Sequence, residues 1–301
     1  MMLEVKHVVM SYGEVKAVQD LSFTIQPGEI FGLLGTNGAG KTTTFRMIMG
    51  LIKPKEGSIS YFNHEVSYED VNTIGYMIEE RSLLTKVTVK DLMMYLGQLK
   101  DVSKEDIDTR LDYWLERFGI SSYKTKKVKE LSKGNQQKIQ FIAALINNPK
   151  LLILDEPFSG LDPINTEIFV SAIRDFQKQG AMVIFSSHQL DHVESFCEKI
   201  VVLEKGKVIL EGPIQEIKEA YQKLNIKIKA KNIDIDVIQS IEGVINVDVQ
   251  PHAIMVKVSS KDCVKDVFNY IKTCDDVMTF DVLEPPLSEI FIDKVKNHEK
   301  A

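Results

Sequence analysis

The sequence predicts an α/β fold built on a mainly parallel sheet, followed by a smaller α+β domain. In the first part, short apolar segments that are typical of buried strands alternate with helices of ordinary length. Strands connected through helices form parallel sheets that are covered on both faces. After Pro213 the order of expected elements changes to strand, helix, strand, strand, helix, strand, which is the split β-α-β, or ferredoxin-like, pattern.

The elements of the first part are bounded by common start and stop signals. Residues 30–34 are short, apolar and flanked by glycine, as in a buried strand. A helix over 41–49 would end at Gly50, a favourable residue just past a helix C-terminus. Thr88 and Ser103 each precede an aspartate by three residues, which is the spacing of a helix start. The other expected elements are strands at 3–10, 21–25, 151–154 and 182–186, and a helix opened by Asp162 and Pro163.

The second domain is expected over residues 221–301, after a first domain over 1–220. A helical stretch at about 214–223 would connect the two. The expected strands of the second domain are 224–229, 244–250, 254–259 and 277–283, and its helices are 233–241, 261–272 and one that follows Pro285 and Pro286.

Composition restricts the class of protein. The chain has 301 residues, 44% of them hydrophobic, and a formal net charge of −6. This is enough apolar content for a sizeable core, and the charge argues against a broad nucleic-acid-binding face. Three cysteines without a C-x-x-C pair favour a reducing compartment. The N-terminus lacks a signal-peptide pattern, and no apolar run reaches the roughly 18–20 residues of a membrane span, so we expect a soluble, cytoplasmic protein.

A glycine-rich loop lies between a predicted strand and a predicted helix. Residues 35–42, GTNGAGKT, match the pattern G-x-x-x-x-G-K-[ST] in full, in the strand–loop–helix context that a phosphate-binding loop requires. Backbone N–H groups and the positive end of the helix dipole would hold phosphate oxygens, which side chains would obstruct. We expect Lys41 to bridge the β- and γ-phosphates, Thr42 to ligate Mg²⁺ and Thr43 to reach the α-phosphate. The expected nucleotide-contacting residues here are Gly35, Thr36, Asn37, Gly38, Ala39, Gly40, Lys41, Thr42 and Thr43.

A second part of the expected site is residues 151–157, LLILDEP. An apolar strand that ends in two carboxylates places them at the carboxyl edge of the sheet, where α/β proteins bind ligands. Asp155 would hold Mg²⁺ through water. Glu156 would then orient and deprotonate an attacking water, a step typically worth 10²–10⁴-fold in rate. The alternative interpretation is an acidic turn at a strand end, which becomes weak beside a phosphate loop.

Residues 130–140, ELSKGNQQKIQ, lie between these two motifs. With them, the segment closely resembles the ATPase subunits of ATP-binding cassette (ABC) transporters, in which an LSGGQ-type signature begins a helix shortly before the acidic strand. Ser132, Gly134 and Asn135 occupy signature positions, while Lys133 and Asn135 depart from the consensus. The LSKGNQQK variant is similar to that of bacterial type-2 exporters. Small residues at a helix start expose N–H donors to an anion, although a plain helix cap at Ser132 is an alternative.

Other positions match the family in order, and the resemblance covers residues 1 to about 215. It implies that Tyr12 stacks on adenine with Val18 as an apolar contact, that Asp162 lies in the D-loop at a subunit contact, and that His188 bonds the γ-phosphate. In the segment resembling the Q-loop, Glu79 stands where glutamine is usual. Its carboxylate can still ligate Mg²⁺ or order water.

The resemblance implies a P-loop NTPase fold of the ABC ATPase type, with an antiparallel β subdomain, a helical subdomain at about 88–147, and ATP and Mg²⁺ as cofactors. Glu156, His188 and Lys41 would be catalytic, and Thr42, Glu79 and Asp155 would hold the metal. Two copies would sandwich ATP head to tail and drive an exporter through a separate membrane permease, on the inner face of the cell membrane.

The permease contact is expected around residues 79–95, where several side chains are apolar, although burial in the domain's own core is the competing account. These side chains are Leu83, Leu84, Val87, Met93 and Met94. The main alternative function is a soluble ABC-type ATPase that acts on ribosomes or DNA. Neither a tandem cassette nor a long coiled coil is present to favour that alternative. We expect no nucleic-acid partner.

Overall fold

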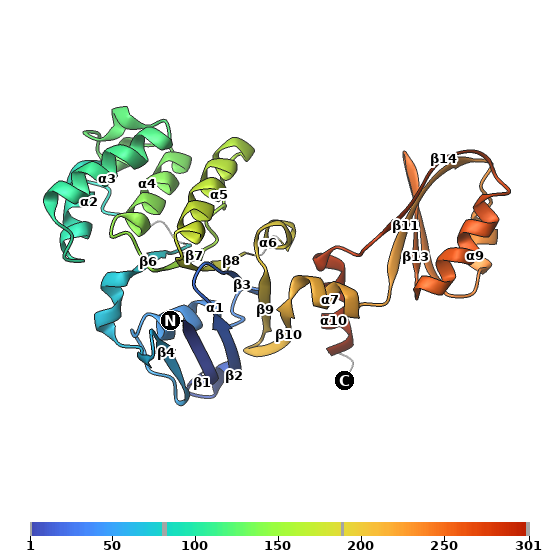
Figure 1. The fold of residues 1–301 in the computed structure, drawn as a ribbon, viewed down its shortest axis with the longest axis horizontal. Helices are drawn as coiled ribbons and strands as arrows, with labels where there is room; N and C mark the ends of the chain where they lie inside the picture. The colour runs from blue at the N-terminus through green and yellow to red at the C-terminus, as the bar shows by residue number, and fades with distance from the viewer. Residues whose placement is uncertain (1, 80–82, 188–189, 299–301) are drawn as a thin grey trace. The chain divides into compact units, whose positions relative to one another are not determined.

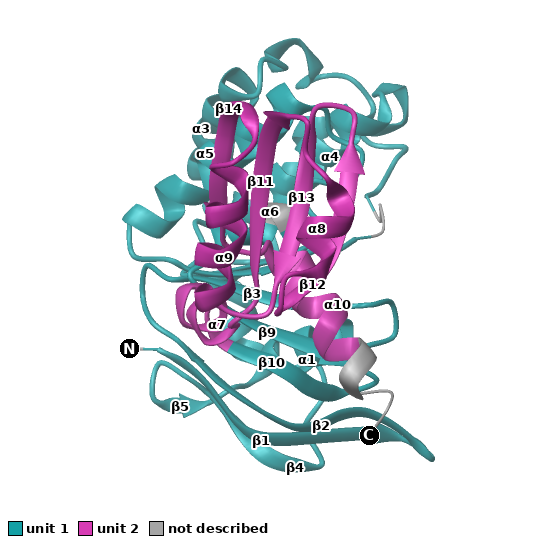
Figure 2. Ribbon diagram, turned by 90° about the vertical axis from the view of Figure 1, so that its right-hand side faces the viewer, with its two compact units in different colours: residues 1–211 teal, residues 212–301 magenta. Residues whose placement is uncertain are grey.

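A computed structural model describes residues 2–79, 83–187 and 190–298. The chain divides into two compact units, residues 1–211 and 212–301 (Figure 2). The boundary precedes the one expected at residue 220, because helix α7 (Ile214–Ala220) packs against the C-terminal helix α10 (Leu287–His298) within the second unit. Among the described helices, none is long and apolar enough to cross a membrane.

The first unit is built on a sheet that has ten strands within the described part of the chain, in the order β5-β4-β1-β2-β10-β9-β3-β8-β7-β6 (Figure 1). Strands β3, β9, β8, β7 and β6 pair in parallel, while β1, β2 and β4 pair antiparallel. The sequence-based α/β prediction is therefore confirmed. The strands are β1 (Leu3–Tyr12), β2 (Val15–Ile25), β3 (Ile30–Gly35), β4 (Glu56–Tyr61), β5 (His64–Glu65), β6 (Ile74–Met77), β7 (Leu151–Asp155), β8 (Met182–Ser186), β9 (Lys199–Glu204) and β10 (Lys207–Pro213).

The helix starts that the sequence signals predict in the first unit are present in the structure. The Thr88 and Ser103 hydroxyls each accept a hydrogen bond from the amide of the aspartate three residues later, at 3.1 Å. Gly50 has φ +67 and its N–H donates to the Met47 carbonyl, which ends α1. The helices are α1 (Lys41–Ile48), α2 (Val89–Gln98), α3 (Lys104–Arg117), α4 (Lys133–Leu145), α5 (Pro163–Lys178) and α6 (Leu190–Phe196), with short 3₁₀ turns at Tyr68–Thr73, Ser121–Tyr123 and Val128–Glu130.

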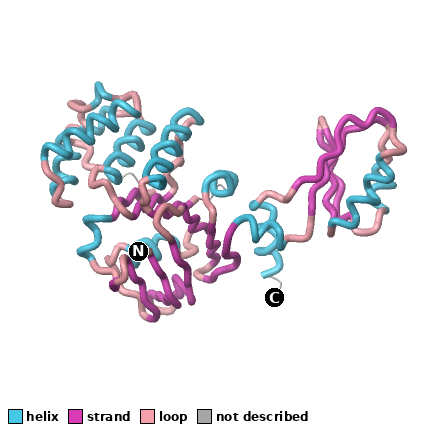
Figure 3. The backbone as a smooth tube through the Cα atoms, in the orientation of Figure 1, coloured by secondary structure: helices cyan, strands magenta, loops and turns pink. Residues whose placement is uncertain are grey.

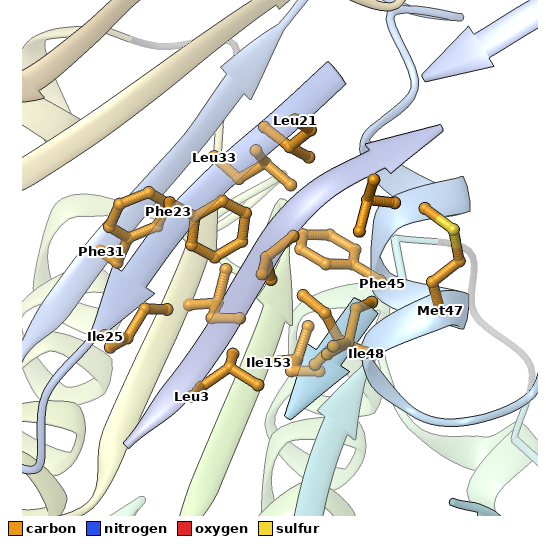
Figure 4. Close-up of a cluster of buried hydrophobic side chains, with 14 of the residues drawn as sticks. Leu3, Leu21, Phe23, Ile25, Phe31, Leu33, Phe45, Met47, Ile48 and Ile153 are labelled. Atoms are coloured by element: carbon orange, nitrogen blue, oxygen red, sulfur yellow. The ribbon is translucent and has the colours of Figure 1, made fainter. Parts of the chain in front are cut away.

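A continuous apolar core holds the ends of the parallel strands in place (Figure 4). Phe23 of β2 stacks on Phe31 of β3, with ring centroids 4.6 Å apart. Phe45 of α1 and Ile153 of β7 belong to the same cluster, and both are fully buried. The strand before the phosphate loop, the helix after it and the acidic strand are therefore fixed against one another, which positions the loop.

The second unit has a four-stranded antiparallel sheet in the order β12-β13-β11-β14, formed by β11 (Leu224–Lys231), β12 (Val244–Gln250), β13 (Ala253–Val258) and β14 (Asp275–Leu283). Helices α8 (Ile235–Ser240) and α9 (Lys261–Ile271) lie on one face of it (Figure 3). The core of this unit includes Ile226, Ile238 and Val267. This element order confirms the predicted split β-α-β pattern. On α10, the Asp293 carboxylate accepts hydrogen bonds from Tyr221, Lys223 and Lys257.

Candidate nucleotide site

A cavity of about 450 Å³ opens at the carboxyl end of β3. Its wall combines the glycine-rich loop, the end of the acidic strand and two further segments. The lining residues are Val15, Lys16, Ala17, Thr36, Asn37, Gly38, Ala39, Gly40, Lys41, Thr42, Thr43, Glu79, Asp155 and Lys205. Segments predicted separately at residues 36–43, 79 and 155 thus meet at one cavity, because parallel strands present their carboxyl ends at the same edge.

The loop needs glycine at two positions for a steric reason. A Cβ on Gly35 would lie 2.4 Å from the Leu203 carbonyl oxygen, and a Cβ on Gly40 would lie 2.3 Å from the Ala17 carbonyl oxygen. Both glycines also have positive φ, at +147 and +112. Gly40 directly precedes α1, and no side chain caps that helix. The first amides of α1 therefore stay available to an anion.

Lys41 is folded back over this loop. Its side chain is buried, at 8% exposure, and its Nζ donates to the Gly35 carbonyl at 2.7 Å and to the Thr36 carbonyl at 3.3 Å. An ammonium held in this way is a preformed partner for phosphate oxygens. Lys16 and Lys205 add two more cationic side chains to the cavity wall.

The two carboxylates at the end of β7 are both buried, and one serine contacts both residues. The Ser186 hydroxyl donates to Asp155 Oδ1 at 2.5 Å and accepts from the Glu156 amide at 3.3 Å. Burial raises the pKa of Asp155, while the Ser186 bond and Lys41 act against that rise. Glu156 has φ +50, a strained value for glutamate, and Ser187 donates to its carboxylate at 3.5 Å. Such strain is typical of functional sites.

The residues expected to hold Mg²⁺ line the cavity together. Thr42 and Glu79 are exposed to it, and Asp155 is buried at 3% exposure. Within the described ranges, no group of three or more His, Cys, Asp or Glu side chains is arranged to hold a metal. A hydroxyl with two carboxylates fits Mg²⁺, which takes most of its ligands from substrate phosphates and water.

The signature residues do not line this cavity. Ser132 caps α4, and its hydroxyl accepts from the Asn135 amide at 3.4 Å. The side-chain amide of Asn135 donates to the Tyr123 hydroxyl. Around Gly134 the space is open, since a Cβ there would have nothing within 4 Å. The capping interpretation of Ser132 is thus confirmed, and it leaves an exposed helix start at this segment.

Several other expected contacts also lie outside the cavity. Asp162 caps α5, accepting from the Asn165 amide at 2.9 Å, and this bond lowers the pKa of its carboxyl. Tyr12 ends β1 with 47% exposure, and Val18 is fully buried behind Gly40 rather than facing a ligand. Glu156 and Gly35 adjoin lining residues without lining the cavity themselves. His188 lies outside the described residues.

Four of the lining residues are not predicted from the sequence: Val15, Lys16, Ala17 and Lys205. Lys205 belongs to the turn between β9 and β10 and has φ +49. The next residue, Gly206, donates its N–H to the Ala39 carbonyl, which attaches this turn to the phosphate loop. The dipeptide Lys-Gly signals a turn, but no local pattern places that turn beside the loop.

An apolar groove of about 410 Å³ is a second feature of the first unit. It includes Leu83 from the region expected to contact a permease, and the neighbouring Leu84 is 51% exposed. Met93 is fully buried, so for this residue the competing core account is correct. The lining residues are Met49, Leu51, Tyr68, Val71, Ile74, Tyr76, Ile78, Leu83, Leu96, Leu99, Lys100, Gln140 and Ala143.

Each of the two units matches a known protein family. Residues 18–159 match the family model described as ABC transporter. Residues 212–295 match a model described as ATP-binding protein DrrA1-3-like, C-terminal domain. The chain is 45% identical over 294 residues to the uncharacterized ABC transporter ATP-binding protein YhaQ of Bacillus subtilis, which covers 98% of each chain. It is 34% identical over 210 residues to the ABC transporter ATP-binding protein NatA of the same organism, covering 68% of this chain and 85% of NatA.

Solved structures give the same result for the first unit. An ATP-binding subunit of an ABC transporter superposes with a TM-score of 0.69 at 29% identity, covering 73% of this chain and 93% of that one. The dimeric bacterial cassette MJ0796 superposes with a TM-score of 0.65 at 26% identity, covering 71% of this chain and 99% of that one. Fold, motifs and full-length similarity agree: the chain belongs to the ABC transporter family, as one of its ATP-binding subunits, which are ATPases.

Proposed function

We propose that this chain hydrolyses ATP between two copies arranged head to tail, and that the cycle drives export through a membrane permease to which it binds on the cytoplasmic side. The observation that supports the paired arrangement is a separation within one copy. Lys41 and Asp155 line the nucleotide cavity, whereas Ser132 and Gly134 lie elsewhere on an open helix start. A second copy would bring its signature to the exposed side of the bound triphosphate.

Each residue of the proposed site would have its own role. The loop amides and Lys41 would bind the β- and γ-phosphates, and Tyr12 would stack on adenine, since its strand partner Val15 lines the cavity. Glu156 would orient and deprotonate the attacking water. His188, which lies outside the described residues, would bond the γ-phosphate. Loss of the γ-phosphate would remove the contact that holds the two copies together.

Mg²⁺ fits the same cavity. Thr42, Asp155 and Glu79 would hold the ion, with Asp155 acting through water. When bound, the ion neutralises the charge that develops on the phosphate oxygens.

The variant Gly134→Ala tests the paired arrangement without disturbing the fold. Nothing lies within 4 Å of the added methyl group, and alanine favours a helix by about 1 kcal/mol over glycine. We expect unchanged or higher thermal stability and retained ATP binding, but at least tenfold lower ATPase activity and dimerisation, because the methyl group would meet the partner's γ-phosphate. Calorimetry measures thermal stability, nucleotide titration measures ATP binding, phosphate release measures ATPase activity and light scattering measures dimerisation. Lys104→Ala, an exposed first-turn change on α3, is the control. Normal dimerisation of Gly134→Ala would contradict the sandwich.

The apolar groove supports a permease contact. Side chains along it and at its rim are exposed although they are large and apolar, including Leu51 at 48%, Tyr68 at 65% and Leu99 at 61%. Exposed apolar patches of this kind mark interaction sites. An apolar cytoplasmic segment of a permease would cover these side chains.

Leu84→Asp tests the docking step. The side chain is half-exposed, so the substitution should leave folding and basal ATPase activity unchanged. We expect at least a tenfold loss of affinity for the membrane permease that the chain is proposed to drive, measured by pull-down and titration of detergent-solubilised permease. Val249→Asp, on an exposed residue of β12 in the second unit, should bind like wild type. Equal binding by Leu84→Asp would refute docking at this surface.

The same preparation separates transport from the alternative classes. ATPase activity of the wild-type chain should rise with permease in liposomes and stay constant with ribosomes or DNA. Stimulation by ribosomes or DNA alone would assign the chain to the soluble class.

A further inference from the structure

We infer that Lys100 recognises the permease through an ion pair. The permease segment that occupies the apolar groove presents a carboxylate to the Lys100 ammonium. This inference rests on the proposed docking of a permease at the groove and specifies the chemistry of that partner. Among the described residues that line the groove, Lys100 alone carries a charge. A lone cation in a mainly apolar groove needs an explanation, because its desolvation is unfavourable unless an anion meets it.

The ammonium is held in a defined position. Its Nζ donates to the Ile74 carbonyl at 2.5 Å, and the same carbonyl accepts from the Asn147 side-chain amide at 3.3 Å. An ammonium has three N–H donors, so one bond to a shared carbonyl leaves donors directed elsewhere. The backbone of Lys100 is fixed too, since its N–H donates to the Gly97 carbonyl at the end of α2.

No carboxylate compensates this charge within the described part of the first unit. The carboxylate of the adjacent Asp101 accepts a hydrogen bond from the Asn72 side-chain amide at 2.8 Å. Glu79 lines the nucleotide cavity rather than the groove. Desolvation lowers the pKa of Lys100 to about 8, which agrees with an uncompensated cation. Coverage of the groove by an apolar segment would desolvate it further.

The partner's chemistry follows from this arrangement. An apolar segment without an acceptor would trap an unpaired charge, which is strongly unfavourable. A segment with one Asp or Glu at the position facing Lys100 would satisfy it, and the pair would also fix the register of docking. Selection among permeases would therefore depend on one acidic residue within an apolar cytoplasmic segment.

The test uses the 301-residue chain and the membrane permease that it is proposed to drive, in detergent and in proteoliposomes. Lys100→Met should lower permease affinity at least tenfold, which is 1.4 kcal/mol, while basal ATPase activity stays unchanged. It should also raise the melting temperature of the isolated chain, because an uncompensated cation is replaced by an apolar side chain. Lys100→Arg should bind within about threefold of wild type. Lys104→Met is the control for loss of one positive charge.

Charge reversal decides the identity of the acceptor. Lys100→Glu should abolish permease stimulation, and an Asp→Lys or Glu→Lys substitution in one cytoplasmic segment of the permease should restore it. Permease affinity of Lys100→Met equal to wild type would overturn the inference, as would rescue by none of the cytoplasmic acids. A lower melting temperature for Lys100→Met would also overturn it, by assigning Lys100 a structural role at Ile74. If Leu84→Asp loses permease binding while Lys100→Met does not, the result supports docking at the groove and refutes only the proposed pairing of Lys100 with a permease carboxylate.

Discussion

Glu156→Gln should bind ATP and dimerise but hydrolyse ATP at a hundredth or less of the wild-type rate. Glutamine keeps the size of the side chain and can accept a hydrogen bond from Ser187, which donates to Glu156 at 3.5 Å. It cannot take a proton from water, and general-base catalysis is typically worth 10²–10⁴-fold. At about 1.4 kcal/mol per tenfold, this raises the barrier by about 3–5 kcal/mol.

Phosphate release under saturating magnesium-ATP measures the rate, and size-exclusion chromatography with ATP measures the trapped dimer. Glu167→Gln provides a matched control, because this glutamate is exposed on α5. A Glu156→Gln chain that keeps most of its turnover would remove this residue from the base role. Loss of ATP binding would instead indicate damage to the loop with φ +50.

Gly40→Ala should lower ATP affinity at least a hundredfold. The new Cβ would lie 2.3 Å from the Ala17 carbonyl oxygen, and the backbone φ of +112 is unfavourable for alanine. Because the obstructing atom belongs to a strand backbone, the phosphate loop must move to relieve the clash. Such a shift displaces the amides at the start of α1 from the phosphate positions.

Titration with a fluorescent ATP analogue measures this affinity, and circular dichroism verifies that the variant is folded. Gly180→Ala separates strain from collision, since it has φ +89 but nothing within 4 Å of the added atom and lies at the turn before β8. It should cost about 1–2 kcal/mol of stability and leave nucleotide affinity unchanged. Wild-type affinity in Gly40→Ala would show that the loop tolerates the shift.

The parts of the site that sequence predicted are those that local patterns determine. The loop at 35–43 is a continuous strand–loop–helix segment, so its cavity could be anticipated from the chain alone. Asp155 was predictable because it ends a buried apolar strand, and the carboxyl ends of parallel strands form the edge at which ligands bind. Thr88 and Ser103 needed only the three-residue spacing of helix caps.

The parts that escaped prediction depend on contacts between distant segments. Lys205 reaches the cavity because β10 pairs with β2. This pairing places Lys207 opposite Gln19, although the two residues are far apart in the sequence. No periodicity in the sequence specifies that pairing. Val18 and Met93 show the converse, since an apolar residue near a site can face the core or a ligand, and both are fully buried. The groove around Lys100 likewise combines residues from 49 to 143.

The placement of the signature turn outside its own cavity has a genetic consequence. If each nucleotide site is completed by the signature segment of the other copy, a chain with a defective Gly134 region inactivates a site on the intact chain that it pairs with. A cell that expresses both alleles would lose more export than the fraction of faulty protein predicts, since many healthy molecules would be matched with a faulty one. Mutations at 132–135 should thus be dominant where a permease still holds the faulty chain beside an intact one, whereas unstable chains that are degraded before assembly should be recessive.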